Sequence, residues 1–295
     1  MKILLTCLNF KGLTGSELYF LDLACGLQKI GNDVSILSQM KDGFLHEKAS
    51  KYGVKCYDFS QAPNEKFDII LASHRPVIKS FVEDNLYADT PIISINHSEV
   101  IQLEFPLIDL RIVHYIAIRE SIKSFLKDKY FIDDEMISLI HNPINTDKLL
   151  SKKGLKPKRK YVLFPATIDY LRKETIIDLS KKANEENFDL VIVGENKSDY
   201  IESVLSENVT WHTPSWEIQN FYRNATHTSG IQMGRTEIEG YFFGLPCYRY
   251  NVNRDGEIIS NSLIEPPDFD TCMETYGYIS VAKKIENLIN KILTK

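Results

Sequence analysis

Short apolar runs and amphipathic stretches alternate along the first half of the chain. An apolar run at residues 2–8 is followed by residues 16–30, where apolar side chains recur at helical spacing, and then by an apolar run at 33–37. Further apolar runs lie at residues 54–59, 67–72, 92–96 and 115–118. Runs of about five residues separated by helical segments are typical of a parallel sheet that helices cover on both faces. The first half therefore predicts a doubly wound α/β domain.

The same pattern begins again after a polar segment at residues 151–160. This segment is rich in lysine, carries a glycine and a proline, and lacks a core pattern, as is typical of a linker. The second set of apolar runs lies at residues 161–165, 189–193, 209–211, 228–232 and 247–250. We expect an α/β protein of two Rossmann-like, doubly wound domains facing across a cleft, residues 1–157 and 158–278, with an amphipathic helix at 279–295. Ligands of such domains bind in the loops at the carboxyl ends of the strands.

The composition is that of an ordinary globular protein, with 43% apolar and 25% charged residues. The formal net charge of −5 gives no basic surplus of the kind that nucleic-acid-binding domains show. No apolar run approaches the ~20 residues of a membrane-spanning helix, and the first residues lack the pattern of a secretory leader. The five cysteines are widely spaced without a C-x-x-C pair, which disfavours a thiolate zinc site. We expect a cytoplasmic protein, with peripheral association with a membrane left open.

Two loops place candidate anion-binding groups at the starts of predicted helices. Thr14, Gly15 and Ser16 lie between the first apolar run and the first helix, where backbone N–H groups bind anions, although Ser16 is equally suited to a simple N-cap. Arg172 and Lys173 stand at the start of the first helix of the second half, where acidic residues are usually favoured. Two cations at this position suit a phosphate group, and a solvated helix start is the alternative.

Residues 230–246 form the most specific pattern of the chain. A strand leads through Gly234 into a short helix that begins with carboxylates and ends at Gly-Leu-Pro. Gly234 leaves room for a ligand against the backbone. Glu237 or Glu239 can accept hydrogen bonds from the vicinal hydroxyls of a ribose, and either carboxylate is also explained as a favourable charge at a helix start.

This segment resembles a motif of the GT-B glycosyltransferases of glycosyltransferase family 4, E-x-F-G-x-x-x-x-E-A-x-x-x-G-x-P. Gly234, Glu239, Gly244 and Pro246 fall on its spacing without a gap, and Ile231 stands in place of its first glutamate. Shorter stretches that resemble the family's phosphate loop, sugar-contacting strand, hinge turn, donor-phosphate segment and following strand lie at residues 14–17, 91–97, 138–145, 163–173 and 190–194. The resemblance thus extends over most of the chain.

The resemblance implies a role for each matching residue. Glu239 would hold the donor ribose, Arg172 and Lys173 would neutralise the diphosphate, and His97 would touch the transferred sugar. Further donor contacts would come from Thr14, Gly15, Ser16, Gly194, Thr213, Pro214, Met233, Gly234, Arg235 and Glu237. The first domain would lie on the acceptor side, and the final helix would pack back on it.

The activity that the resemblance implies is retaining transfer of a sugar from a nucleotide-diphosphate sugar, UDP-linked, to an acceptor hydroxyl. No cofactor and no metal are expected, although Asp268 and Asp270 form a D-x-D pair of the kind that binds a metal in another glycosyltransferase fold. The acceptor stays open between a glycan, a lipid-linked sugar, a small molecule and a modified DNA base. Ile231 leaves open a catalytically weakened nucleotide-binding module. A DNA-base-modifying glucosyltransferase and a nucleotide-sugar epimerase also stay open as functions of this fold.

Overall fold

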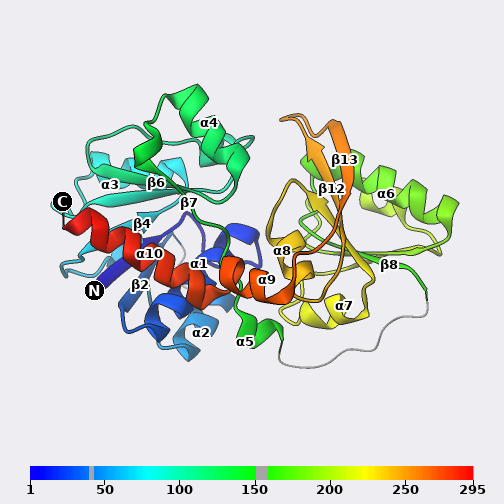
Figure 1. The fold of residues 1–295 in the computed structure, drawn as a ribbon, viewed down its shortest axis with the longest axis horizontal. Coiled ribbons are helices and arrows are strands. Elements are labelled where there is room, and N and C mark those ends of the chain that lie inside the picture. The colour runs from blue at the N-terminus through cyan, green and yellow to red at the C-terminus, as the bar shows by residue number, and fades with distance from the viewer. Residues whose placement is uncertain (40–42, 151–158, 295) are drawn as a thin grey trace. The chain divides into compact units, whose positions relative to one another are not determined.

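The computed structural model describes residues 1–39, 43–150 and 159–294. These residues form two compact units, Met1–Asn145 with Thr275–Lys295, and Thr146–Glu274 (Figure 1). The domain boundary expected at residue 157 falls in 151–158, outside the described residues, and the compact units change over at Asn145. Within the described ranges, no helix is both long and apolar enough to cross a membrane.

The first unit is built on a seven-stranded parallel sheet. Its strands follow the order β3 (Lys55–Asp58), β2 (Asp33–Ser38), β1 (Lys2–Thr6), β4 (Ile69–Ala72), β5 (Ile92–Asn96), β6 (Ile112–Ala117) and β7 (Ile137–Leu139). The helices of this unit are α1 (Gly15–Lys29), α2 (Phe44–Lys51), α3 (Arg75–Glu83), α4 (Glu120–Tyr130) and α10 (Tyr278–Leu293). The central strands are buried on both faces, which explains why they read as continuous apolar runs.

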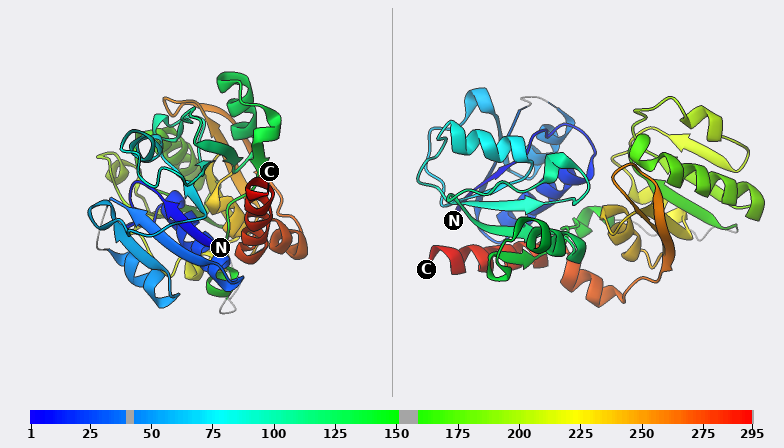
Figure 2. Two further views of the ribbon diagram at one scale, coloured as in Figure 1. Left: turned by 90° about the vertical axis from the view of Figure 1, so that its left-hand side faces the viewer. Right: turned by 90° about the horizontal axis from the view of Figure 1, so that it is seen from above.

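Helix α10 packs along α1 and completes the first unit (Figures 1 and 2). The contact depends on Gly26, because a Cβ atom there would lie 2.6 Å from the backbone oxygen of Tyr278 and 3.0 Å from the Cβ of Ala282. The side of α10 that carries Val281, Ile285 and its neighbours is buried. Small side chains at the contact therefore let the two helix backbones approach closely.

The chain leaves the first unit and returns to it at one point. The backbone N–H of Ile144 donates to the carbonyl of Tyr276 at 2.8 Å, and the N–H of Tyr278 donates to the carbonyl of Ile144 at 3.0 Å. Asn145 adds a hydrogen bond from its backbone N–H to the carboxylate of Asp22 on α1, at 3.2 Å. The exit and the return are thus fastened to each other within the first unit.

The second unit has a six-stranded sheet of which five strands are parallel. The order is β10 (Val209–His212), β9 (Asp189–Val193), β8 (Tyr161–Pro165), β11 (His227–Ile231), β12 (Cys247–Val252) and β13 (Ile258–Ile264), with β13 antiparallel to β12. The helices are α5 (Thr146–Leu149), α6 (Lys173–Glu186), α7 (Gln219–Asn224), α8 (Arg235–Tyr241) and α9 (Phe269–Tyr276), whose last two residues already belong to the first unit. The two sheets confirm the predicted α/β fold of two Rossmann-like domains.

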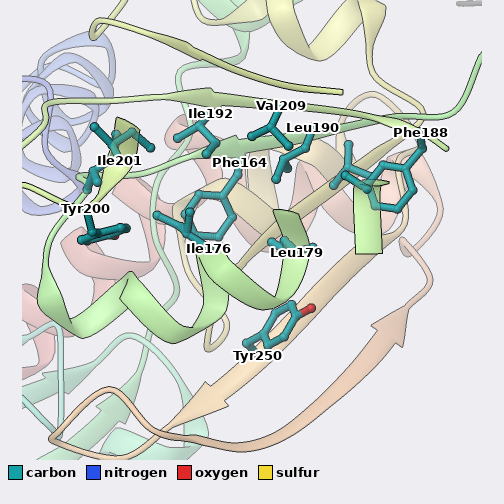
Figure 3. Close-up of a cluster of buried hydrophobic side chains, with 13 residues drawn as sticks. Phe164, Ile176, Leu179, Phe188, Leu190, Ile192, Tyr200, Ile201, Val209 and Tyr250 are labelled. Atoms are coloured by element: carbon teal, nitrogen blue, oxygen red, sulfur yellow. The ribbon is translucent and has the colours of Figure 1, made fainter. Parts of the chain in front are cut away.

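The main core of the second unit lies between its sheet and α6. Phe164 and Ile192 point from β8 and β9 toward Ile176 and Leu179 of α6 (Figure 3). Tyr250 of β12 closes the cluster, and its hydroxyl donates to Asp178 at 2.6 Å. This packing fixes the start of α6 relative to the carboxyl ends of the strands.

The strand order reverses once in each sheet, between β1 and β4 in the first unit and between β8 and β11 in the second. At such a point the two flanking loops run to opposite faces of the sheet, and ligands bind in the crevice that this leaves. In the second unit these are the loops that contain Arg172 and Gly234, two of the residues singled out from the sequence.

Candidate functional site

The loop after β11 is held at the switch point of the second unit by hydrogen bonds to three backbone carbonyls. Thr236 Oγ1 donates to the carbonyl of Pro165 at the end of β8, at 2.9 Å. The hydroxyl of Tyr222 donates to the carbonyl of Thr236 at 3.1 Å, and the N–H of Gln232 donates to the carbonyl of Tyr250 at 2.6 Å. Gln232 has a φ of 53°, which is uncommon for a residue with a side chain. The sharp turn from strand to helix is thereby fixed from both sides.

Gly234 lies in this turn, and a Cβ atom added there would meet no heavy atom within 4 Å. Met233 and Arg235 on either side are half-buried. The space over the backbone of Gly234 is consistent with the expectation that a ligand approaches the chain closely at this residue.

Glu239 lies on α8 with only 6% of its surface exposed. Its Oε1 accepts a hydrogen bond from Nε of Arg235, one helical turn earlier, at 2.7 Å. Burial, together with the neighbouring charge of Glu239, raises the pKa of the Tyr222 phenol well above its usual value. The carboxylate is therefore held in one orientation by a cation from its own helix.

Glu237, the other carboxylate of α8, is 1% exposed and has internal partners for both of its oxygens. Nε of Arg249 donates to Oε2 at 2.7 Å, while Nη2 of Arg249 and the hydroxyl of Tyr241 donate to Oε1. The hydrogen bonds to Glu237 raise the pKa of the Arg249 guanidinium. These contacts join α8 to β12 and give Glu237 a structural explanation, so they do not support the prediction that it contacts a donor.

Arg172 and Lys173 stand side by side where α6 begins, but their surroundings differ. Asp169 accepts the backbone N–H of Arg172 at 3.1 Å and also pairs with its guanidinium. Lys173 lies 5.9 Å from the ring centroid of Tyr200 and, among the described residues, makes no ion pair. Lys173 is therefore the cation of this pair whose charge is not already balanced by a carboxylate.

Three of the predicted donor contacts, Gly194, Thr213 and Pro214, lie farther from the switch point. A Cβ atom on Gly194 would overlap the carbonyl oxygen of Ala166, so this glycine is required by the packing of two adjacent loops. The carbonyl of Gly194 also accepts a hydrogen bond from Nε1 of Trp211 at 2.9 Å. Thr213 and Pro214 follow the edge strand β10 and are exposed.

The predicted phosphate loop of the first unit is closed over the buried carboxylate of Glu17. The backbone N–H of Gly12 and the hydroxyl of Thr14 donate to its Oε2, at 3.0 Å and 3.1 Å. Thr14 consequently makes no side-chain cap to α1. Gly15 is exposed with no heavy atom within 4 Å of an added Cβ, and Ser16 is half-buried, so the open part of the loop is the first turn of α1 itself.

His97 follows β5 and packs edge-on against Tyr19, with ring centroids 4.7 Å apart. Its Nε2 is buried and has no hydrogen-bond partner among the described residues. The hydroxyl of Tyr19 is likewise buried without a partner among them. Burial lowers the pKa of His97 to about 4, against the opposing charge of Glu104. His97 is therefore a neutral group near pH 7, able to donate or accept a hydrogen bond but not to supply charge.

A second histidine lies beside it. The backbone N–H of Leu8 donates to Nδ1 of His74 at 3.0 Å, which leaves Nε2 to donate to Glu104 at 3.1 Å. Burial would raise the pKa of Glu104, but its hydrogen bond to His74 and the neighbouring His97 lower it overall. His74 has a φ of 69° where the chain enters α3. Sequence reasoning missed Glu104, whose only signal is a single carboxylate between Leu103 and Phe105.

A cavity of about 630 Å³ lies at the carboxyl ends of β2 and β3. Its wall combines apolar, hydroxyl and carboxylate groups from Gln39, Asp58, Phe59, Ser60, Val77, Ser80 and Asp84. Such a mixture suits a ligand with several hydroxyl groups and an apolar face.

Asp268 of the D-x-D pair is explained by helix capping. Asp268 Oδ1 accepts the backbone N–H of Thr271 at 2.9 Å and Oδ2 accepts its hydroxyl at 2.6 Å, at the start of α9. In the part of the chain that the structure describes, no group of three or more His, Cys, Asp or Glu side chains is arranged to hold a metal ion.

Solved structures that resemble this chain are glycosyltransferases, although no family model matches and no curated protein is similar in sequence. HepE of Anabaena, determined with UDP and glucose, is 12% identical with a TM-score of 0.74 over 98% of this chain and 99% of its own. A glycosyltransferase from Rickettsia africae is 15% identical with a TM-score of 0.70, and covers 100% and 99% of the two chains. Sucrose-phosphate synthase from Thermosynechococcus elongatus is 12% identical with a TM-score of 0.67 over 99% of each. At these identities the likeness shows the fold, which is that of GT-B glycosyltransferases.

Proposed function

We propose that this GT-B chain transfers a sugar from a nucleotide-diphosphate sugar, UDP-linked, to an acceptor hydroxyl with retention of configuration. The observation that carries the proposal is the switch point of the second unit. An unbalanced cation, Lys173, and a buried carboxylate, Glu239, lie on α6 and α8, the helices that follow the two flanking loops, with open backbone at Gly234. Binding a nucleotide sugar requires a cation for its diphosphate, a carboxylate for its ribose hydroxyls and space against the backbone. HepE, which shares the fold, is described in complex with UDP-glucose.

The ribose is the part of the donor that Glu239 suits. A carboxylate accepts two hydrogen bonds from vicinal hydroxyls, and such charge-assisted bonds are short and strong. Arg235 fixes the carboxylate through Oε1, so little rotational freedom of Glu239 is lost when the ribose binds.

The diphosphate is the part that Lys173 suits. Negative charge grows on the departing diphosphate in the transition state, and a cation placed there stabilises it more than it stabilises the bound donor. Because Asp169 pairs with Arg172, we assign the larger share of this stabilisation to Lys173. A diphosphate held in this way requires no metal ion, and an oxygen of the donor phosphate can take the acceptor proton.

The first unit then supplies the acceptor side. His97 would hydrogen-bond a hydroxyl of the transferred sugar through Nε2, which has no protein partner among the described residues. The cavity beside Asp58 and Phe59 would take a hydroxyl-rich acceptor. The assignment of His97 is the one that the resemblance found in the sequence implies, whereas the cavity is proposed from the structure.

Donor binding and turnover are tested separately. UDP and UDP-sugars are expected to raise the melting temperature, because they bind the folded chain alone. With a panel of glycans, lipid-linked sugars, small hydroxyl compounds and modified DNA, one acceptor class should give UDP release and a product whose anomeric configuration matches the donor. Turnover should persist in excess chelator. If neither UDP nor any UDP-sugar shifts the melting temperature, the proposal is wrong.

Ile231 favours a second candidate, a nucleotide-sugar-binding protein without turnover. Its side chain packs against the core of the second unit, so no polar group meets the sugar at this position. This candidate predicts the same thermal shift with UDP-sugars, but no UDP release with any acceptor of the panel.

A further inference from the structure

The outer edge of β13 is unpaired in the second unit. β13 is the last strand of the sheet, and in the described ranges it pairs only with β12 (Figure 1). Ile259 is 68% exposed and Leu263 is 47% exposed. An unpaired strand edge with exposed apolar side chains is a template for another strand, and proteins usually blunt it with charge or proline.

The register shows which backbone groups face outward. The carbonyls of Pro246 and Tyr250 accept hydrogen bonds from β11 and the turn after it, so alternate residues of β12 turn their backbone groups to β13. These residues, Arg249 among them, lie opposite Ser260, Ser262 and Ile264. The N–H and C=O groups of Asn261 and Leu263 therefore point away from the sheet.

The sequence of β13 is almost the same in both directions. Ile258–Ile264 reads Ile-Ile-Ser-Asn-Ser-Leu-Ile, which is symmetric about Asn261 except that Ile259 is matched by Leu263. Two copies paired antiparallel about a two-fold axis through Asn261 would place isoleucine opposite isoleucine and serine opposite serine. Asn261 of one copy would exchange both backbone hydrogen bonds with Asn261 of the other. The run contains no charged side chain that would repel the second strand.

We propose that β13 pairs with β13 of a second copy of this chain, joining two six-stranded sheets into one continuous sheet. Two features limit its strength. A β-bulge leaves Ile259 without a partner on β12, and bulges of this kind twist an edge. Glu257 and Glu265 bound the run and bring like charges to its ends. One strand edge also buries less than the ~1,200 Å² of a stable interface, so the dimer forms at high micromolar concentration and strengthens with salt.

Sedimentation over the micromolar to millimolar range tests the pairing. The wild-type chain should move from monomer to dimer with concentration, and Asn261→Pro should stay a monomer, because proline removes an outward N–H without removing a bond to β12. Asn261→Thr, which keeps the N–H, should dimerise like the wild type. A wild-type chain that stays monomeric throughout, or an Asn261→Pro chain that dimerises equally, overturns the proposal.

Cysteine cross-linking gives an independent test should the proline variant fold poorly. Cα atoms of a hydrogen-bonded antiparallel pair are ~5.5 Å apart, within disulfide range, so Asn261→Cys should form a covalent dimer under mild oxidation. Ser260→Cys places its two copies on a diagonal of ~7–8 Å and should not. The native cysteines are free, and Cys56 alone among them is not buried, so the wild type provides the background. Equal cross-linking at both positions contradicts the symmetric register.

Discussion

At the scale of single residues, two buried carboxylates two positions apart on one short helix have partners from different parts of the second unit. Glu237 is bound by Arg249 of β12 and by Tyr241, whereas Glu239, also buried, is bound by Arg235 of its own helix and lies beside the Tyr222 hydroxyl. The sequence could not separate them, because both suit a helix start equally well. Side-chain partners from β12, distant in the chain, make the distinction.

Glu239→Gln and Glu237→Gln are expected to differ for this reason. Glu239→Gln should weaken UDP binding about tenfold or more, since it removes a charge-assisted pair of bonds to the ribose, and should also lower the free energy of unfolding, because the Arg235 guanidinium loses its counter-charge. Glu237→Gln should keep UDP binding but lose about 3 kcal/mol of stability, because a mostly buried guanidinium loses its counter-charge. Calorimetric titration and urea unfolding measure the two effects. The assignment of Glu239 fails if the first variant binds UDP normally.

Lys173→Ala and Arg172→Ala form a second matched pair. The lysine variant should lose about 10²–10³-fold in turnover, the typical effect of removing one group that stabilises transition-state charge. The arginine variant should lose less, because Asp169 already balances its charge. The measurement is UDP release at saturating donor. Equal losses would assign the diphosphate to both cations.

His97 should make the free energy of unfolding depend on pH. Its pKa is about 4 in the folded chain and higher when unfolded, so the unfolded state binds a proton first as the pH falls. The contribution of His97 to the free energy of unfolding is complete above about pH 6.5. It declines toward pH 4, by at most about 3 kcal/mol. His97→Phe should flatten the free energy of unfolding between about pH 6.5 and 4.5. Below that window Glu104, whose pKa is lowered, adds its own dependence. An unchanged slope in the variant contradicts the burial of a neutral imidazole.

At the scale of helices and strands, periodicity predicts the elements that are strongly apolar or amphipathic. The helix expected at 16–30 is Gly15–Lys29, and the runs at 92–96 and 189–193 are strands with those bounds. β13 was not predicted, because its middle is polar and exposed and its place is set by pairing with β12. Helix α8 begins at Arg235, ahead of the carboxylates with which the sequence analysis expects it to begin, since the turn at Gly234 starts it.

Gly26→Ala tests how closely α1 and α10 are packed. The added Cβ lies 2.6 Å from a backbone oxygen of α10, which cannot rotate away as a side chain could. Overpacking of this kind costs about 1–3 kcal/mol, even though alanine is the better helix former. Gly15→Ala, where an added Cβ meets nothing within 4 Å, should leave stability nearly unchanged. Comparison of the two melting temperatures gives the result, and equal values would mean that α10 is loosely attached.

At the scale of the whole molecule, the sequence predicted two Rossmann-like domains, and the two sheets with their reversed strand order confirm this. Parallel strands buried on both faces leave a strong apolar signal, so the architecture can be read without a homologue. The candidate site stays a prediction, and the sequence indicates only the loops near which its residues lie. The sequence pattern does not contain the spatial neighbours of a residue. Those neighbours decide which cation is already paired, which glycine has open space and which histidine nitrogen lacks a hydrogen bond.

The return of the chain to the first unit makes that unit discontinuous. Residues Thr275–Lys295 are synthesised after the entire second unit, so the ribosome has made both sheets before α10 reaches α1. Until then, the surface around Gly26 stays open to chaperones or to another nascent chain. The second unit, in contrast, is one uninterrupted stretch, whereas isolating the first requires a designed splice between Asn145 and Thr275.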